Sequence, residues 1–132
     1  MYAQRLEAIP LFAALAPEER ELVGDLVDPI QVPEGHKVAS QDAFGYSFFA
    51  IEEGTAEVLV DDVGVAQLGP GDFFGEIALL CTGRRTAAVV ATSPMKLLSL
   101  FDRDFREIEA KVPGLGGELR RVAGERLAAA RA

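Results

Sequence analysis

The most informative stretch of this sequence is Gly75-Glu76-Ile77-Ala78-Leu79-Leu80-Cys81-Thr82-Gly83-Arg84-Arg85-Thr86-Ala87. It combines an acid, a short run of helix-forming residues, two glycines, two arginines and a hydroxyl. Glycine lets the backbone approach a ligand closely, the first turn of a helix presents unpaired amides to an anion, and arginine offers a planar fork that matches phosphate oxygens. Because these groups are so close in sequence, one small ligand could touch all of them. The stretch therefore indicates a phosphate-binding site.

The sequence on both sides of this stretch is typical of a roll of short antiparallel strands. Between residues 29 and 101, short runs rich in Val, Phe, Ile and Leu are punctuated by Gly and Pro. Asp61-Asp62-Val63-Gly64 predicts a hairpin turn, and the two glycines within residues 68–72 predict a tight corner. Residues 76–81 have the composition of one helical turn inserted into this roll. Strands are expected at residues 29–33, 37–40, 46–52, 55–61, 64–68, 85–91 and 95–101.

Helices are expected on both sides of the roll. Pro17 at an early helical position, with Glu18 and Glu19 in the first turn, predicts an amphipathic helix that opens near residue 16. After the roll, Asp102 is expected to cap a helix that stops at Val112-Pro113-Gly114. The helical segments therefore frame the strands in the order helix, roll, helix.

A final helix is expected from about residue 115 to residue 130. Its apolar stripe, which ends at Ala130, would allow the helix to dock on the roll. Its glycines make the helix less stable, because each glycine in a helix interior costs roughly 1 kcal/mol relative to Ala. The sequence thus predicts an α+β fold in one domain, residues 1–132. Its parts are an N-terminal helical segment (1–28), an antiparallel, jelly-roll-like β-roll with an inserted short phosphate-binding helix (29–101), and C-terminal helices (102–132).

The composition fits a single soluble domain and disfavours several kinds of partner. The chain has 132 residues, of which 49% are hydrophobic, enough for one core. With 21 acids against 13 bases, the net charge is -8, which argues against nucleic acid as a partner. No run of about 18 uncharged apolar residues is present, so no membrane insertion is expected. The single cysteine, Cys81, excludes an intrachain disulfide framework and fits a reducing cytoplasm.

Few catalytic or metal-binding arrangements are compatible with this sequence. His36 is the only histidine, whereas zinc hydrolases and Ser-His or Cys-His nucleophile systems each need a placed imidazole. It stands in Pro33-Glu34-Gly35-His36-Lys37, a turn signal, where an exposed residue is expected. We therefore expect no metal site, no catalytic residue and no enzymatic activity.

The chemistry of the central stretch rests on Arg85 and Glu76. An arginine that faces a cavity from a strand must be paired, and a phosphodiester is a well-shaped partner; a surface arginine, or one paired with Glu76, is the alternative. The amides of Ala78 and Leu79 would favour the same anion. Thr86 adds a hydroxyl, although threonine can simply favour a strand. A carboxylate accepts hydrogen bonds, and the natural donor on a nucleotide is the ribose 2′-hydroxyl, which indicates ribose and phosphate together.

At this point the residues resemble a known family. The run Phe74-Gly75-Glu76-Ile77-Ala78-Leu79-Leu80, followed by Gly83-Arg84-Arg85-Thr86-Ala87-Ala88-Val89, is similar to the phosphate-binding cassette of cyclic nucleotide-binding domains. Such domains occur in catabolite-activator-type regulators, regulatory subunits of cyclic AMP-dependent protein kinase, and cyclic nucleotide-gated channels. The Arg-Arg-Thr-Ala form is most similar to that of hyperpolarisation-activated channels. Glu53-Gly54, the Gly69-Pro70-Gly71-Asp72 turn and the order of helices extend the resemblance over nearly the whole chain.

The resemblance implies roles for individual residues of the cassette. Glu76 would accept the ribose 2′-hydroxyl, Arg85 would pair with the cyclic phosphate, and Thr86 would support the phosphate or the purine. The final helix would fold over the base as a lid, with Arg126 as the best candidate for a base contact. Val58 and Val65 could line the purine side, or be ordinary core. The expected binding residues are Gly75, Glu76, Ile77, Ala78, Leu79, Arg85, Thr86, Ala87 and Arg126.

The sequence therefore predicts a non-catalytic regulatory domain that binds cyclic AMP or cyclic GMP and signals by rearrangement of its C-terminal helices. No other cofactor is expected, and the partners would be an effector domain or another protein, with a homodimer as a further option. The choice between the two nucleotides and the pose of the base stay open. The alternatives are a degenerate domain that acts as a protein-interaction module, a cupin-like metal enzyme, which a single histidine disfavours, and a regulator whose DNA-binding part lies elsewhere.

Overall fold

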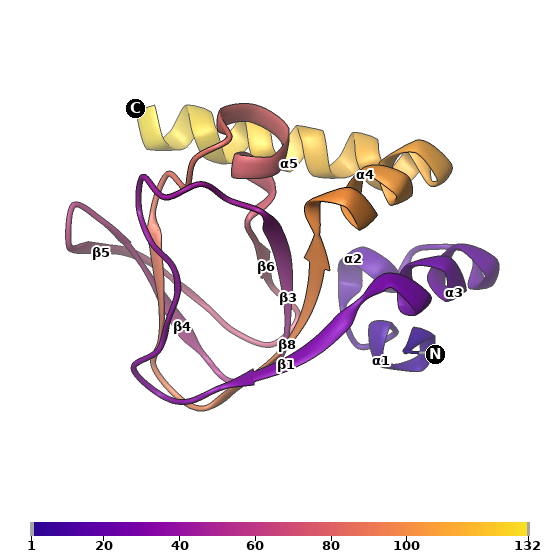
Figure 1. Ribbon diagram of the computed structural model, residues 1–132, viewed down its shortest axis with the longest axis horizontal. Helices are drawn as coiled ribbons and strands as arrows, with labels where there is room; N and C mark the ends of the chain where they lie inside the picture. The colour runs from indigo at the N-terminus through magenta and orange to yellow at the C-terminus, as the bar shows by residue number, and fades with distance from the viewer. Residues whose placement is uncertain (1, 132) are drawn as a thin grey trace.

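The computed structural model describes residues 2–131, with side chains described through residue 128. Two four-stranded antiparallel sheets form a roll, with helices packed beside and across it (Figure 1). The first sheet has the order β1-β8-β3-β6, and the second has the order β2-β7-β4-β5. This architecture confirms the predicted α+β roll. The strands are β1 Asp28–Val32, β2 Lys37–Ala39, β3 Ser47–Glu53, β4 Ala56–Val60, β5 Val63–Leu68, β6 Phe73–Phe74, β7 Ala88–Ala91 and β8 Met95–Phe101.

Three N-terminal helices pack beside the first sheet: α1 (Ala3–Leu6), α2 (Pro10–Ala13) and α3 (Pro17–Leu26). The predicted helix corresponds to α3, where Pro17 is the first residue and the Glu19 side chain accepts the amide of Ala16 at 3.0 Å. The sequence did not predict α1 and α2, because four residues are too few to show a helical period. An ion pair between Arg5 and Glu52 of β3 holds this segment against the sheet.

The main core lies between the first sheet and the helices. The ring centroid of Phe48 on β3 is 6.4 Å from that of Phe12, 5.5 Å from that of Phe73 and 5.6 Å from that of Phe105. Burying one such side chain contributes roughly 1.5–3 kcal/mol. A second cluster fills the closed end of the roll between the two sheets; it includes Ile51, Phe74, Val89, Met95 and Leu97. The two clusters leave the other end of the roll for the cassette.

The cassette, residues 75–87, crosses this open end of the roll. Its helical part is a π-helix, η1 (Ala78–Thr82), which stops at Gly83 with a φ of +72° and a bond from the Gly83 amide to the Ala78 carbonyl at 2.8 Å. The predicted strand 85–91 was wrong at its start, since β7 begins at Ala88. The backbone of Arg85 bonds instead to the loop before β3, with its amide 2.7 Å from the Ala43 carbonyl.

Two helices complete the fold: α4 (Asp102–Lys111) and α5 (Pro113–Arg131). Asp102 was predicted as the cap of α4, but the capping residue is Phe101 and Asp102 is the first helical residue. Helix α5 begins earlier than predicted, at Pro113, and lies over the open end of the roll against η1 (Figure 1). Leu115 and Leu119 bury its apolar stripe, while the side chain of Ala130 lies outside the described residues. Within residues 2–131, no helix is long and apolar enough to cross a membrane.

Candidate functional site

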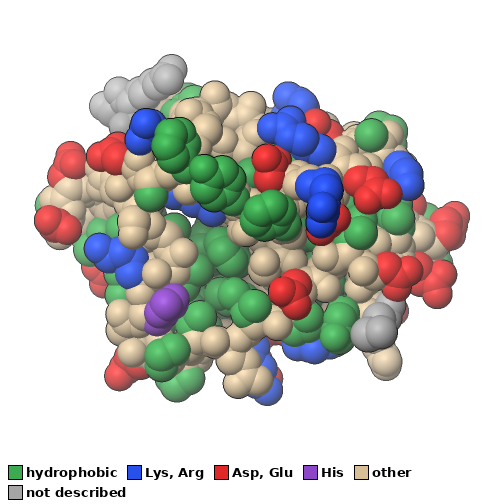
Figure 2. All heavy atoms as spheres, viewed as in Figure 1, with side chains coloured by type: hydrophobic (Ala, Val, Ile, Leu, Met, Phe, Trp, Pro, Cys, Tyr) green, Lys and Arg blue, Asp and Glu red, His purple; other side chains and the backbone are tan. Residues whose placement is uncertain are grey.

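A cavity of about 700 Å³ opens into the roll beneath the cassette and α5. One side is apolar, and Figure 2 shows hydrophobic side chains in the hollow of the roll. The other side carries one acid and two arginines, Glu76, Arg85 and Arg126. We call this space the roll cavity. Its apolar wall comes largely from β4 and β5, which contribute Val58, Val60, Val65, Ala66 and Leu68, and it also includes Ala39, Phe74 and Val89.

Arg85 is a buried cation at the wall of the roll cavity. Only 9% of its surface is exposed, and its guanidinium donates to the carbonyl of Gly75 at 3.1 Å and to that of Ser47 at 2.6 Å. Burial lowers the pKa of Arg85, and the charge of Glu76 opposes this change. A guanidinium has five N–H donors and stays protonated in proteins. The side chain therefore presents further donors and a positive charge to the cavity.

Two glycines make room for this guanidinium. A Cβ at Gly75, whose φ is +101°, would stand 2.7 Å from the Ser47 carbonyl oxygen and 2.8 Å from Nη1 of Arg85. A Cβ at Gly45 would stand 2.9 Å from Cζ of Arg85 and 2.5 Å from the Cβ of Ala78. The sequence pointed to Gly75 but not to Gly45 or Ser47. These two lie far upstream in the chain, and nothing in their local pattern distinguishes them from the start of an ordinary strand and the turn before it.

Glu76 is the most buried charged group of the site. Its exposed fraction is 0%, and Oε1 accepts a hydrogen bond from Nη1 of Arg126 at 2.6 Å. Burial raises the pKa of Glu76 above its ordinary value of 4.5, while the charge of Arg126 and, to a lesser degree, that of Arg85 oppose the rise. The second oxygen, Oε2, is buried and has no hydrogen-bond partner among the described residues. An acceptor buried in this way needs a donor.

Arg126 ties α5 to the cassette. Besides Glu76, its Nη1 donates to the carbonyl of Phe73 at 3.0 Å, and its Cζ lies 4.8 Å from the centroid of the Phe73 ring. The sequence placed Arg126 at the site as a candidate for a base contact. The structure brings it to the site through the carboxylate of Glu76, a pairing across 50 residues that the sequence did not predict.

Most of the other predicted site residues line the roll cavity: Gly75, Ile77, Ala78, Thr86 and Ala87, together with Val58 and Val65. Leu79 is the exception, because its side chain packs into the main core and does not line the cavity. Arg84 and Cys81 are exposed, as is His36 in its turn. Among residues 2–131, no group of three or more His, Cys, Asp or Glu side chains could hold a metal ion.

The arrangement suits an amphiphilic anion. The apolar wall fits a flat, uncharged ring, Arg85 fits an anionic group, and Oε2 of Glu76 fits a hydroxyl between them. A bare phosphate would be repelled by the carboxylate, whereas a ligand that carries a hydroxyl beside its phosphate satisfies both groups.

Comparison with known proteins gives the family. Residues 29–111 match the family described as cyclic nucleotide-binding domain. A cAMP-dependent protein kinase regulatory subunit of Aspergillus fumigatus is 38% identical over 110 residues, which cover 82% of this chain and 27% of that protein. The chain spans about a quarter to a third of the length of such curated relatives, from 25% to 33%.

Solved structures show the same fold. The Thermus thermophilus catabolite activator protein superposes with a TM-score of 0.81 and 31% identity, over 92% of this chain and 60% of that chain. The regulatory subunit of a cAMP-independent protein kinase A from Trypanosoma brucei superposes with a TM-score of 0.84 and 25% identity, over 93% of this chain and 44% of that chain.

Proposed function

The chain belongs to the cyclic nucleotide-binding domain family, and we propose that its roll cavity binds cyclic AMP or cyclic GMP as the input of a non-catalytic regulatory domain. The domain would comprise residues 1–132, with 1–28 and 102–132 as the helical segments on either side of the roll. Its output would pass to an effector domain or a protein partner through the C-terminal helices.

The observation that carries this proposal is the buried oxygen Oε2 of Glu76. It belongs to a residue that lines the roll cavity, and it has no hydrogen-bond partner among the described residues. The charges of Arg126 and Arg85 lie close to the same carboxylate. The ribose 2′-hydroxyl of a cyclic nucleotide is a donor of suitable size and charge. Leaving such a buried acceptor unpaired costs about 1–3 kcal/mol, so the hydroxyl should contribute strongly to affinity.

Arg85 would hold the cyclic phosphate. Its guanidinium is positioned by the carbonyls of Gly75 and Ser47, and its remaining donors lie at the cavity wall. The backbone at Gly75, Ala78 and Leu79 would complete the cradle, and Thr86 would add a hydroxyl to the phosphate or to the base. A charge-assisted pair of this kind is short and roughly twice as strong as a neutral hydrogen bond.

The purine would lie against the apolar wall that includes Val58 and Val65. This wall accepts either base, and Thr86 is compatible with both nucleotides. A side-by-side titration with cyclic AMP and cyclic GMP, followed by thermal unfolding, measures the preference. A ligand at 100 times its dissociation constant stabilises the fold by about 2.7 kcal/mol.

Helix α5 would transmit binding. Arg126 joins α5 to the carboxylate that is proposed to take the ribose, so a ligand at Glu76 alters the partners of the helix. The change is a shift between docked and loose states of α5, limited by the difference in the ligand's affinity for the two states.

The decisive test compares cyclic AMP with its 2′-deoxy analogue on the wild type and on Glu76→Gln. We expect the wild type to lose about tenfold or more in affinity for the deoxy analogue, and the Gln variant to distinguish the two nucleotides much less. Titration calorimetry measures all four affinities. Equal binding of both nucleotides by the wild type would exclude the ribose contact, and no binding of either cyclic nucleotide would favour a protein-interaction module.

A further inference from the structure

The segment that precedes β3, residues 40–46, runs beside the arginine pair of the cassette, and we call it the bridging loop. Phe44 of this loop forms an isolated antiparallel bridge with Arg84, outside both sheets. Next to the bridge, the amide of Arg85 donates to the carbonyl of Ala43 at 2.7 Å. These backbone contacts fix the point at which the side chain of Arg85 leaves the cassette.

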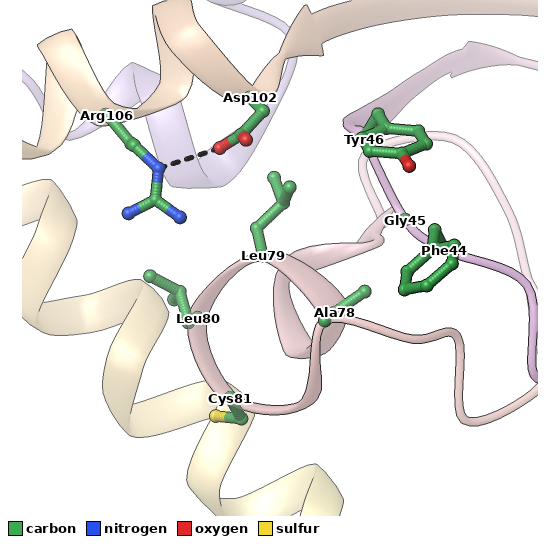
Figure 3. A pocket seen from close by; sticks show the side chains of 10 residues that line it. Phe44, Gly45, Tyr46, Ala78, Leu79, Leu80, Cys81, Asp102 and Arg106 are labelled. Atoms are coloured by element: carbon green, nitrogen blue, oxygen red, sulfur yellow. Dashed lines mark hydrogen bonds and ion pairs between the residues drawn. The ribbon is translucent and has the colours of Figure 1, made fainter.

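Gly45 is the residue of the bridging loop that lies against the guanidinium of Arg85. Its amide donates to the carbonyl of Gly83 at 3.1 Å, and it lies on the segment that faces Ala78 of η1 (Figure 3). A Cβ at this position would stand 2.9 Å from both Cζ and Nε of Arg85, and 2.5 Å from the Cβ of Ala78. At separations below 3.0 Å one of the atoms must shift. The bridging loop can therefore close on the arginine only because Gly45 has no side chain.

The contacts, and not the backbone conformation, exclude a side chain at Gly45. The φ of Gly45 lies outside the left-handed region, whereas the φ of Gly75 is +101°, so an L-residue could adopt the backbone of position 45. The guanidinium is the far end of a flexible side chain, and it would yield to a new Cβ more readily than backbone atoms. Arg85 would then leave the carbonyls of Gly75 and Ser47, to which it now donates at 3.1 Å and 2.6 Å. We therefore expect Gly45→Ala to displace the arginine in a chain that still folds.

We propose that Gly45 is a positioning residue for Arg85, which makes the free donors of the guanidinium face the roll cavity in one fixed direction. One N–H on each terminal nitrogen is already bound to a carbonyl, and a guanidinium is planar, so the directions of the remaining N–H groups follow. The two exocyclic oxygens of a cyclic phosphate point in different directions, and a fixed planar fork distinguishes them. Binding groups must be held within about 0.5 Å for such a distinction. The selection between the oxygens rests on the proposed function, whereas the positioning of Arg85 does not.

The first measurement uses the full chain without nucleotide. In a ¹⁵N–¹H correlation spectrum, the Nε–Hε resonance of Arg85, assigned by its loss in Arg85→Lys, reports the surroundings of the guanidinium. We expect Gly45→Ala to shift this resonance or to broaden it. The control is Gly69→Ala, because a Cβ at Gly69 would meet nothing within 4 Å among the described residues, and it should leave the resonance in place. An unchanged resonance in Gly45→Ala would overturn the positioning role.

The second measurement uses the two phosphorothioate diastereomers of cyclic AMP, each of which carries sulfur, a weaker acceptor, in place of one exocyclic oxygen. We expect the wild type to bind one diastereomer about tenfold more tightly than the other, and Gly45→Ala to bring the two affinities together. The matched control is Gly24→Ala, because a Cβ at Gly24 would stand 2.4 Å from the backbone nitrogen of Ala3, and neither residue lines the roll cavity. This variant should melt at a lower temperature and keep the preference.

A double variant keeps the test decisive if Gly45→Ala alone fails to fold. Ala78→Gly removes the Cβ nearest to the new one, so that Ala78→Gly/Gly45→Ala retains the close approach to Arg85 without the contact to η1. We expect the double variant to lose the diastereomer preference that Ala78→Gly alone keeps. A double variant that keeps it would assign the requirement for glycine to η1, and an equal loss in Gly24→Ala would assign it to stability; either result overturns the proposal. A wild type that binds neither diastereomer would refute the proposed function, while the nucleotide-free spectrum still decides the positioning of Arg85.

Discussion

Arg84 and Arg85 are neighbours in sequence but lie on opposite faces of the cassette. Arg85 faces inward, is 9% exposed and bonds two backbone carbonyls, whereas Arg84 faces outward, is exposed and stacks on Phe44. In water a guanidinium is well solvated, and a surface pair contributes little. Inside the roll, the same group has lost most of its water, and a buried charge is costly unless it is paired and hydrogen-bonded. Burial, and not residue type, therefore distinguishes these two adjacent arginines, and under the proposed function only Arg85 would hold the ligand.

The ion pairs on the two faces differ in the same way. Arg126 pairs with Glu76, a carboxylate with no exposed surface, and joins elements far apart in the chain. Arg106 pairs with Asp102 within one helix turn at the surface. The inner pair therefore connects α5 to the cassette, whereas the outer pair contributes only local support to α4.

The largest expected effect is on cyclic nucleotide affinity, when Arg85 and Arg84 are each replaced by Ala. Arg85→Ala should weaken cyclic nucleotide binding on the order of 100-fold or more, because truncating one partner of a buried charge pair costs about 2–5 kcal/mol. Arg84→Ala should leave the affinity nearly unchanged. Titration calorimetry measures both. Since Arg85 also serves the carbonyls of Gly75 and Ser47, its variant should melt at a lower temperature, so circular dichroism must first confirm that it is folded.

If Arg85→Ala bound cyclic nucleotide with unchanged affinity, the cassette would not be the nucleotide-binding site. An equal loss in both variants would mean that the nucleotide responds to the overall charge of the cassette, and the contrast between its two faces would disappear.

A smaller effect, on the free energy of unfolding, is expected from breaking the Arg126–Glu76 and Arg106–Asp102 ion pairs. Arg126→Ala leaves the Glu76 carboxylate buried with one partner fewer, but Arg126 has a side chain that is 37% exposed, so solvent screens the pair. We expect a loss of about 1–2 kcal/mol in the free energy of unfolding. Arg106→Ala, which breaks an exposed i,i+4 pair, should cost about 0.3–0.5 kcal/mol. Urea unfolding measures both.

Hydrogen exchange sharpens this second prediction. If Arg126 holds α5 on the cassette, the amides of α5 should exchange faster in Arg126→Ala than in Arg106→Ala, and nucleotide should slow them in the wild type. Equal protection of α5 with and without nucleotide would contradict the proposal that this helix transmits binding.

Sequence reasoning predicted the parts of this site that are local. The acid, the glycine and the arginine of the cassette are close in the chain, and the helical turn between strands had a recognisable composition. It could not predict that Arg126 would pair with Glu76, or that Gly45 would lie close against the guanidinium of Arg85, because both contacts depend on how distant segments cross the open end of the roll. These pairings carry no local pattern.

The same distinction explains the errors in the fold. Strand β7 begins later than predicted because Arg85 bonds to residues 42–43, a tertiary contact that overrides the β propensity of the run. The two-residue strand β6 was missed because it exists only through pairing with β3. Helix α5 continues through glycines that disfavour helix, because Leu115 and Leu119 bury its stripe against the core.

The smallest expected effect is the pH dependence of the inner carboxylate. Burial raises the pKa of Glu76 above 4.5, its ordinary value, so between the two values the folded state binds more protons than the unfolded state. The contribution of Glu76 to stability therefore falls as pH rises through this window and is most favourable below it. The ionised form is the better acceptor for a ribose hydroxyl, so nucleotide affinity should instead fall as pH drops through the raised pKa. Stability and affinity then move in opposite directions with pH, and both trends should flatten in Glu76→Gln, as measured by urea unfolding and calorimetry across the acidic range. Identical pH profiles for the two proteins would mean that the carboxylate ionises without consequence for binding, and the contrast between the buried and exposed faces would rest on Arg85 alone.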